Sequence, residues 1–183
     1  DSLVRYLNQL LINEKNIGLN YFRFDKQVSA EENWQKSIEM CNGEYFILLS
    51  DDDLISEINL NDIDIFFKNH DIIFFDSVSI DANSNKILKR NAFLFDCIIN
   101  SKMSAFLLSI SLLRPTLCSI AFKTDIFKKN SLKITKFGLS GDHSDGFLIL
   151  DYLSNSKNTV KICKIVFSKY RIHKGSNSFN LDI

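Results

Sequence analysis

The stretch GEYFILLSDDD occupies residues 43–53, and in it an apolar run is followed directly by three aspartates. Residues 45–49 are continuously apolar, and Asn42 and Gly43 before them are typical of a turn. A short apolar run between turn signals predicts a strand that is buried on both faces, as in a parallel sheet. The three aspartates then stand at the carboxyl end of this strand, where open α/β sheets bind their ligands.

Helical and strand patterns alternate on both sides of this stretch. The capping box formed by Ser29 and Glu32 predicts a helix start, and apolar residues at helical spacing follow it. The first half of the chain predicts a helix over 2–14, a short strand over 19–24, a helix over about 29–41, a helix over about 57–69 and a strand over 72–75. Strands that alternate with helices predict an α/β fold with a mostly parallel sheet flanked by helices.

The second half of the chain departs from this alternation. Its patterns predict an antiparallel hairpin over 77–89, a helical segment over 91–113, a strand over 116–122, a helix over 144–154 and a last strand over 160–170. The apolar residues 105–113 are about half as long as a membrane span. We interpret them as a buried helix, and the alternative is peripheral contact with a membrane surface.

Composition excludes several classes of protein. The chain has 183 residues, of which 45% are hydrophobic, and its 22 basic residues balance its 22 acidic residues. This is the composition of one soluble globular domain, and the zero net charge argues against a nucleic-acid partner. The four cysteines are far apart and form no C-x-x-C pair, which argues against a zinc site and favours buried free thiols.

The three aspartates are the strongest chemical signal. Three adjacent carboxylates repel one another, and a divalent cation such as Mg²⁺ or Mn²⁺ neutralises them while binding phosphate oxygens of a substrate. The alternative interpretation is an acidic cluster that caps a following helix. The position after a buried strand favours the cation.

Residues 33–54 resemble the centre of a family 2 glycosyltransferase with the GT-A fold, in which an Asn opens a helix and Gly-Glu-Tyr, an apolar strand and an acidic motif follow. Two further segments agree with this resemblance. SGDHSDGFL at residues 140–148 is similar to the family's late acidic motif, and YRIHKGSNS at residues 170–178 is similar to its Y-R-x-H-x-x-S ending.

The resemblance implies a donor site for a nucleotide-diphosphate sugar, with a UDP-sugar expected first. A Mg²⁺ or Mn²⁺ ion would bind the diphosphate and stabilise the leaving group. The implied residues are Asp52, Asp53 and His173 for the metal, and Asn33, Asp51, Arg171 and Ser176 for the donor. Asp53 has a second interpretation as a residue that supports the ligands or caps a helix, and the 171–176 segment has one as an exposed basic turn.

The resemblance also implies a carboxylate base that takes the proton from an acceptor hydroxyl, so that one displacement inverts the anomeric carbon. Asp142 is the first choice, Asp145 the second and His143 the third, because the usual Glu-Asp pair reads Asp142-His143 here. The alternative is a capped helix start without a catalytic role.

We therefore expect a single GT-A-like domain over residues 1–183, N-terminally incomplete because the family's nucleotide-binding first two βα units have no counterpart here, with an acceptor side at about 77–135. The expected acceptor is a glycan or lipid-linked glycan, in bacterial surface polysaccharide synthesis in the cytoplasm or at the inner face of the membrane. The sequence leaves the oligomeric state open. The competing functions are a non-catalytic module that binds carbohydrate or a partner, and a phosphatase or nucleotidyltransferase.

Overall fold

The computed structural model describes residues 21–57, 66–67, 70–90, 95–129, 144–156 and 159–173. The chain divides into a unit of residues 1–30 and a unit of residues 31–183. In the first unit, residues 21–24 form no strand, so the predicted strand over 19–24 is wrong there, and Phe22 and Phe24 pack edge to face with ring centroids 4.9 Å apart. The predicted helix over 2–14 lies outside the described residues.

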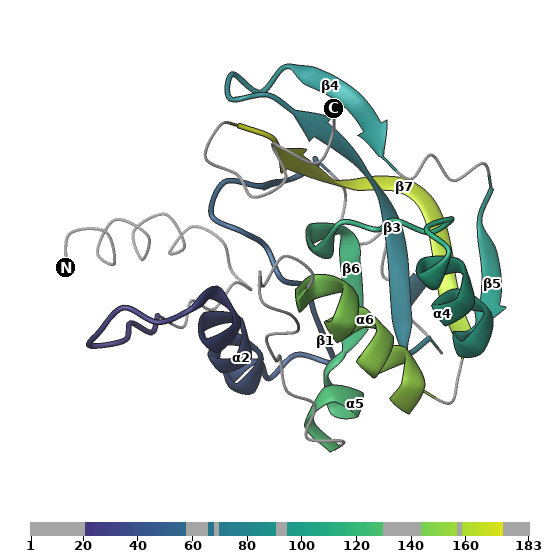
Figure 1. Ribbon diagram of the computed structural model, residues 1–183, viewed down its shortest axis with the longest axis horizontal. Coiled ribbons are helices and arrows are strands. Elements are labelled where there is room, and N and C mark those ends of the chain that lie inside the picture. Colours follow the sequence, from purple (N-terminus) through teal and green to yellow (C-terminus); the bar gives the residue numbers. More distant parts are fainter. Residues whose placement is uncertain are drawn as a thin grey trace. The chain divides into compact units, whose positions relative to one another are not determined.

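The described elements include five strands that follow one another along the chain between two helices (Figure 1). In chain order they are α2 (Ala30–Met40), β1 (Tyr45–Phe46), β2 (Leu54–Ile55), β3 (Ile72–Ile80), β4 (Lys86–Arg90), β5 (Cys97–Asn100), α4 (Ser101–Ser109), the 3-10 turn η1 (Leu117–Ser119), β6 (Ile120–Lys123), α5 (Thr124–Lys129), α6 (Ser144–Asn155) and β7 (Thr159–Arg171). The helix α2 begins directly after Ser29, which confirms the helix that the capping box predicts.

The strands form one mixed sheet in the order β1-β6-β3-β7-β2, with β4 beside β3 and β5 beside β7. Among the described strands only β3 and β7 are parallel, and the other pairs are antiparallel, so the prediction of a mostly parallel sheet is wrong. The apolar run over 45–49 predicts a parallel sheet because a strand that is buried on both faces is typical of one. Both faces of this run are indeed covered. Phe46 and Leu48 pack into one hydrophobic cluster and Tyr45 and Ile47 against another, although β1 pairs antiparallel with β6.

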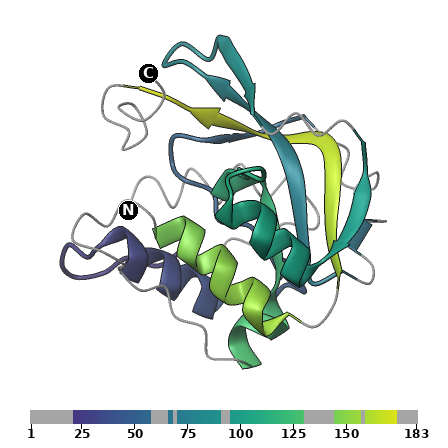
Figure 2. The same cartoon turned by 45° about the vertical axis from the view of Figure 1, so that its right-hand side comes forward.

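The two long central strands, β3 and β7, run side by side and end at the same edge of the sheet. Ile72 pairs with Val160 at one end and Ile80 with Arg171 at the other. The register shifts on either side of Asp76, because β7 contributes more residues than β3 over the same length. Such irregularities bend a strand, and β7 is visibly curled in Figure 2. The carboxyl ends of both strands therefore meet at one place.

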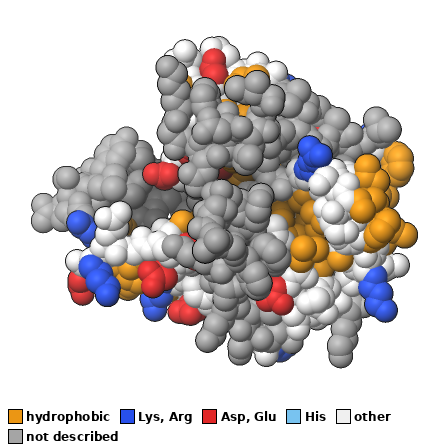
Figure 3. Space-filling view, viewed as in Figure 1, with side chains coloured by type: hydrophobic (Ala, Val, Ile, Leu, Met, Phe, Trp, Pro, Cys, Tyr) orange, Lys and Arg blue, Asp and Glu red, His pale blue; other side chains and the backbone are white. Residues whose placement is uncertain are grey.

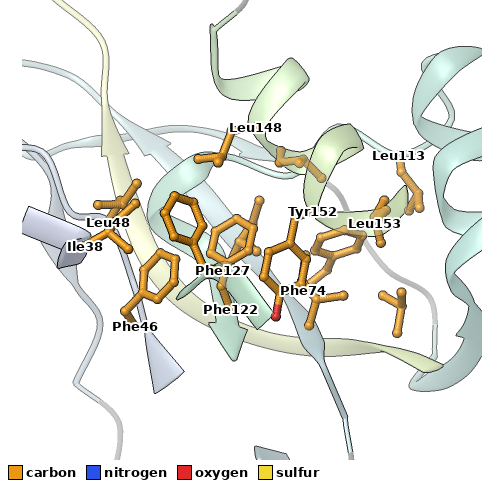
Figure 4. Packing of buried hydrophobic residues seen from close by; sticks show 14 of the residues in the cluster. Ile38, Phe46, Leu48, Phe74, Leu113, Phe122, Phe127, Leu148, Tyr152 and Leu153 are labelled. Atoms are coloured by element: carbon orange, nitrogen blue, oxygen red, sulfur yellow. The ribbon is translucent and has the colours of Figure 1, made fainter. Parts of the chain in front are cut away.

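The main core lies between this sheet and the helices. Side chains from α2, α5 and α6 and from the segment after α4 join those of β1, β3, β6 and β7 in one buried cluster. Figure 4 shows Leu148, Tyr152 and Leu153 of α6 directed at this cluster, with Phe122 and Phe74 close by. A smaller cluster on the opposite face contains Ile73, Phe75, Ala121, Cys163 and Phe167. All four cysteines are free, and two of them, Cys118 and Cys163, are buried.

The second half of the chain confirms some predicted elements and corrects others. The hairpin is formed by β3 and β4, and α6 and β7 lie where a helix and a strand are predicted. The helical segment predicted over 91–113 is wrong at its start, where residues 97–100 form β5 and pair with β7. Of the helix predicted over about 57–69, residues 57 and 66–67 are described. Residue 57 is not helical and residues 66–67 are, whereas residues 54–55 form a strand.

The helix α4 is buried along only one side. Leu107 and Leu108 pack against the main core, while Phe106 is 57% exposed, Ile110 47% and Leu112 71%. Hydrophobic side chains gather on the surface over α4 and β5, as Figure 3 shows. The interpretation of residues 105–113 as a buried helix is therefore correct only in part: the helix ends at Ser109, and only one of its sides packs against the core.

Candidate functional site

The acidic stretch, residues 51–53, lies beside the end of β7 because the two-residue strand that follows it pairs with β7. Leu54 and Ile55 form β2 and pair antiparallel with Lys169 and Ser168 of β7. Because antiparallel strands run in opposite directions, the residues just before β2 lie opposite those just after Lys169. The aspartates and the residues that follow Tyr170 are thereby brought together, although more than a hundred residues of chain separate them.

Asp52 and His173 form the centre of this site. Asp52 Oδ2 and His173 Nε2 are 3.0 Å apart. The two side chains are 32% and 35% exposed, so both remain reachable from solvent. The structure thus brings together two residues for which the family resemblance implies a role at the metal.

Asp53 points the other way, into the protein. It is 6% exposed, and its Oδ1 accepts a hydrogen bond from the backbone N–H of Arg171 at 2.9 Å. Burial raises the pKa of this carboxyl, while hydrogen bonds from Arg171 and Cys118 act against the rise. Burial also raises the pKa of the Cys118 thiol to about 12, and the nearby Asp53 adds to that effect. These contacts agree with the second interpretation of Asp53, in which it supports the metal ligands and does not bind the metal itself.

Arg171 connects three segments through its guanidinium group. Nε donates to Asp52 O at 2.8 Å, and the terminal nitrogens donate to Asp81 O at 2.8 Å, to Ala82 O at 3.1 Å and to Ser84 Oγ at 3.2 Å. These are four hydrogen bonds from a group with five N–H donors. The acidic stretch, the end of β7 and the turn between β3 and β4 are thereby held to one another.

The other predicted site residues are placed as follows. Asp51 is exposed in the turn before β2, and Asn33 is exposed on α2, where its carbonyl oxygen accepts a hydrogen bond from Ser37 Oγ at 2.9 Å. Asp145 lies in the first turn of α6, and its side chain is not among those described. Asp142, His143 and Ser176 lie outside the described residues, so the choice of base stays a prediction.

The possible metal donors that meet at the site are one carboxylate and one imidazole nitrogen. Within the described ranges, no three His, Cys, Asp or Glu side chains are grouped so as to hold an ion. Mg²⁺ typically uses one or two protein carboxylates and fills its octahedron with water and phosphate oxygens. The 3.0 Å separation of Asp52 Oδ2 and His173 Nε2 is that of a hydrogen bond between the two side chains.

The β3–β4 turn, residues 81–85, has no role predicted from the sequence, yet it takes part in the site through Arg171. Its only sequence signal is a cluster of Asp, Asn and Ser residues, which is typical of many turns. The acceptors in this turn are mostly backbone carbonyls, which any residue carries. The role of Cys118 beneath Asp53 is likewise visible only in the structure.

Known proteins resemble this chain in fold rather than in sequence. No protein-family model matches the chain, and no curated protein matches it by sequence. Among solved structures it is similar to residues 1–349 of TarS from S. aureus. The complex of TarS with UDP aligns at a TM-score of 0.69 and 13% identity, over 94% of this chain and 48% of the other.

The complex of the same TarS piece with UDP-GlcNAc aligns at a TM-score of 0.69 and 12% identity, over 100% of this chain and 50% of the other. A longer TarS structure aligns over 94% of this chain and 29% of its own length. The chain thus spans about half of TarS 1–349. At this identity the likeness concerns the fold, and it confirms the predicted GT-A-like α/β class with a mixed rather than mostly parallel sheet.

No helix in the described part of the chain is both long enough and apolar enough to cross a membrane.

Proposed function

We propose that the chain is the donor-binding part of a glycosyltransferase of the family 2 type, which transfers a sugar from a nucleotide-diphosphate sugar. The observation that carries the proposal is the pair Asp52 and His173, which meet at 3.0 Å at the carboxyl ends of β3 and β7. The sequence resemblance assigns both residues to the same metal. The likeness in fold to TarS, solved with UDP and with UDP-GlcNAc, supports a UDP-sugar as the donor.

In this proposal Asp52 and His173 hold Mg²⁺ or Mn²⁺. The bound cation supplies positive charge to the diphosphate that leaves with the nucleotide. Asp52 offers a partly exposed carboxylate, and His173 offers an imidazole nitrogen on the same side. Asp53 keeps the end of β7 in place through the backbone N–H of Arg171. Asp51, which is exposed beside them, is the candidate for a contact with the ribose.

The proposed reaction inverts the anomeric carbon, with Asp142 as the base and Asp145 and His143 as the next candidates. Residues 142–145 directly precede or open α6, and the positive end of a helix dipole keeps a carboxylate ionised and ready to accept a proton. Asn33 and Ser176 complete the proposed donor contacts.

We infer a glycan or lipid-linked glycan as the acceptor, bound on the side formed by residues 77–135. The exposed apolar side chains of α4 and the residues after it, Met103, Phe106, Ile110 and Leu112, are the candidate surface for contact with a membrane. This contact predicts that the chain sediments with anionic lipid vesicles and that Phe106→Ser weakens sedimentation. Equal sedimentation of both chains would contradict it.

Calorimetric titration of UDP with and without Mn²⁺ tests the proposed donor site. We expect Mn²⁺-dependent UDP binding, and we expect Asp52→Asn and His173→Gln each to weaken it at least about tenfold, because each removes one of the few protein ligands of the ion. Asp125→Asn is the matched control, because Asp125 is an exposed aspartate that pairs with Lys129 on α5.

Turnover is measured as release of UDP from UDP-GlcNAc. Loss of turnover in Asp142→Asn with retained UDP binding would support the proposed base. Binding of UDP without turnover would favour the non-catalytic module. Failure of the chain to bind UDP in the presence of Mn²⁺ would refute the proposed donor site.

A further inference from the structure

The β3–β4 turn is held by hydrogen bonds among its own residues. The Asp81 carboxylate accepts hydrogen bonds from the backbone N–H of Asn83 at 2.9 Å, from that of Asn85 at 2.7 Å and from Asn85 Nδ2 at 2.9 Å. Hydrogen bonds from Asn85 are the main reason why the pKa of Asp81 is lowered. Ser84 adopts the left-handed conformation, with φ of 68°, and its N–H donates to Asp81 O.

This shape turns two carbonyl oxygens and one hydroxyl toward Arg171. Asp81 O, Ala82 O and Ser84 Oγ are bound by the terminal guanidinium nitrogens, while Nε is bound to Asp52 O. The turn therefore fixes the plane of the guanidinium, and the guanidinium fixes the backbone of Asp52. A planar, forked donor can do this, whereas a lysine ammonium on a flexible stem cannot satisfy four spread acceptors at once.

The same contacts leave Arg171 poorly suited to bind a phosphate directly. A phosphate clamp by arginine uses two parallel N–H groups, and the observed hydrogen bonds leave one of the five N–H donors. The backbone that Arg171 holds belongs to Asp52, whose carboxylate lies 3.0 Å from His173 Nε2.

We infer that Arg171 is a positioning residue rather than a donor ligand, and that the β3–β4 turn is part of the donor site because it holds Asp52 in register with His173 through Arg171. The functional side of this inference rests on the proposed cation and donor site. Its structural side, the coupling between the turn and the acidic stretch, can be measured without any ligand.

The decisive variant is Asp81→Ala, which loosens the turn without altering Arg171, Asp52 or His173. We expect faster backbone hydrogen exchange in residues 50–56, and a Mn²⁺ affinity that falls about tenfold, the effect of losing about one charged hydrogen bond. Arg171→Lys and Arg171→Gln should act alike, because the fork and not the charge is needed. Asp81→Ala added to Arg171→Gln should change the Mn²⁺ affinity no further, since both variants break the same set of hydrogen bonds between the turn and Asp52.

Two controls separate this coupling from general destabilisation. Asp125→Ala should leave both measurements unchanged. Asn100→Ala, which removes the cap of α4, should speed exchange in α4 without a selective effect on residues 50–56.

Unchanged exchange of residues 50–56 in folded Asp81→Ala, or recovery of Mn²⁺ and UDP affinity in Arg171→Lys relative to Arg171→Gln, would overturn the inference. If exchange rises as expected but the wild-type chain binds neither Mn²⁺ nor UDP, the coupling stands and the proposed donor site fails.

Discussion

Tyr152 shows how one buried hydroxyl joins three elements. Its Oη accepts a hydrogen bond from the backbone N–H of Lys123 at 2.8 Å and lies 2.6 Å from Asp71 O, so α6 is tied to the end of β6 and to the residue before β3. Burial raises the pKa of this phenol. It therefore stays protonated and can serve as donor and acceptor at once.

Tyr152→Phe should lower the free energy of unfolding by about 1 kcal/mol, the net value of a typical intramolecular hydrogen bond. Urea unfolding followed by circular dichroism measures this change. Tyr21→Phe, at a side chain that is 48% exposed, is the control and should change stability by less than about 0.5 kcal/mol. Equal stability of the two variants would contradict the role of the Tyr152 hydroxyl.

His70 predicts a pH dependence of stability. Its Nδ1 lies 3.0 Å from Thr159 Oγ1, and its pKa is lowered from 6.5, first by burial and then by Lys161, with Asp71 acting in the opposite direction. A histidine with a lowered pKa in the folded state favours folding in its neutral form. Its contribution is complete above pH 6.5 and is lost as the pH falls through the folded-state pKa.

The test compares urea unfolding of the wild type and His70→Gln at pH 7.5 and pH 5.5. The stability of the wild type should fall relative to the variant at the lower pH, and the difference cancels the titration of all other groups. If the wild type became more stable relative to His70→Gln at pH 5.5 than at pH 7.5, the predicted direction of the pH dependence would be wrong.

Among the elements, the helix α4 is capped by the residue that precedes it. Asn100, the last residue of β5, is the N-cap, and its Oδ1 accepts a hydrogen bond from Met103 N at 2.8 Å. We expect Asn100→Ala to cost about 1 kcal/mol of stability in urea unfolding, and Asn100→Asp to cost much less because it keeps the acceptor. Similar losses in both variants would point to packing instead of capping.

The elements that the sequence predicts well are those with a long, regular pattern. The spacing of Trp34, Ile38 and Cys41 marks α2, and the last strand carries a long apolar pattern. The apolar run over 45–49 predicts β1, although only Tyr45 and Phe46 form the strand, and it does not reveal the antiparallel partner of β1. The two-residue strand β2 has no pattern of its own and is seen only in the folded chain.

The residues of the candidate site are likewise only partly predictable from the sequence. Asp52 and His173 are predicted from side-chain chemistry and from the family resemblance, and the structure brings them together. The hydrogen bonds of Arg171 go mostly to backbone carbonyls, which every residue carries, so no residue pattern predicts them. The inward direction of Asp53 follows from the pairing of β2 with β7 and is equally hidden in the sequence.

For the molecule as a whole, stability depends on a core of aromatic rings on one face of the sheet. Phe122 is fully buried, stacks on Phe46 at 5.2 Å and meets Tyr152 edge to face at 5.0 Å. Phe122→Ala should lower the free energy of unfolding by about 3–5 kcal/mol, a large share of the roughly 5–15 kcal/mol of a typical domain.

Urea unfolding measures this loss, with Phe95→Ala as the control, because Phe95 is 66% exposed. If Phe122→Ala is too unstable to purify, Phe122→Leu gives a milder form of the same test and should still be less stable than Phe95→Ala. Equal stability of the control and the core variant would contradict the placement of the core.

The pairing of β2 with β7 has one more consequence. The two partners at its end, Asp52 and His173, are separated by 121 positions along the chain. An ion held by both would bridge two parts of the chain that are close together only when the chain is folded, so it would bind the native form and not the unfolded one. Since anything that binds only the native form raises the melting temperature, a rise in the melting temperature on addition of Mn²⁺ would report how much of the chain holds the ion.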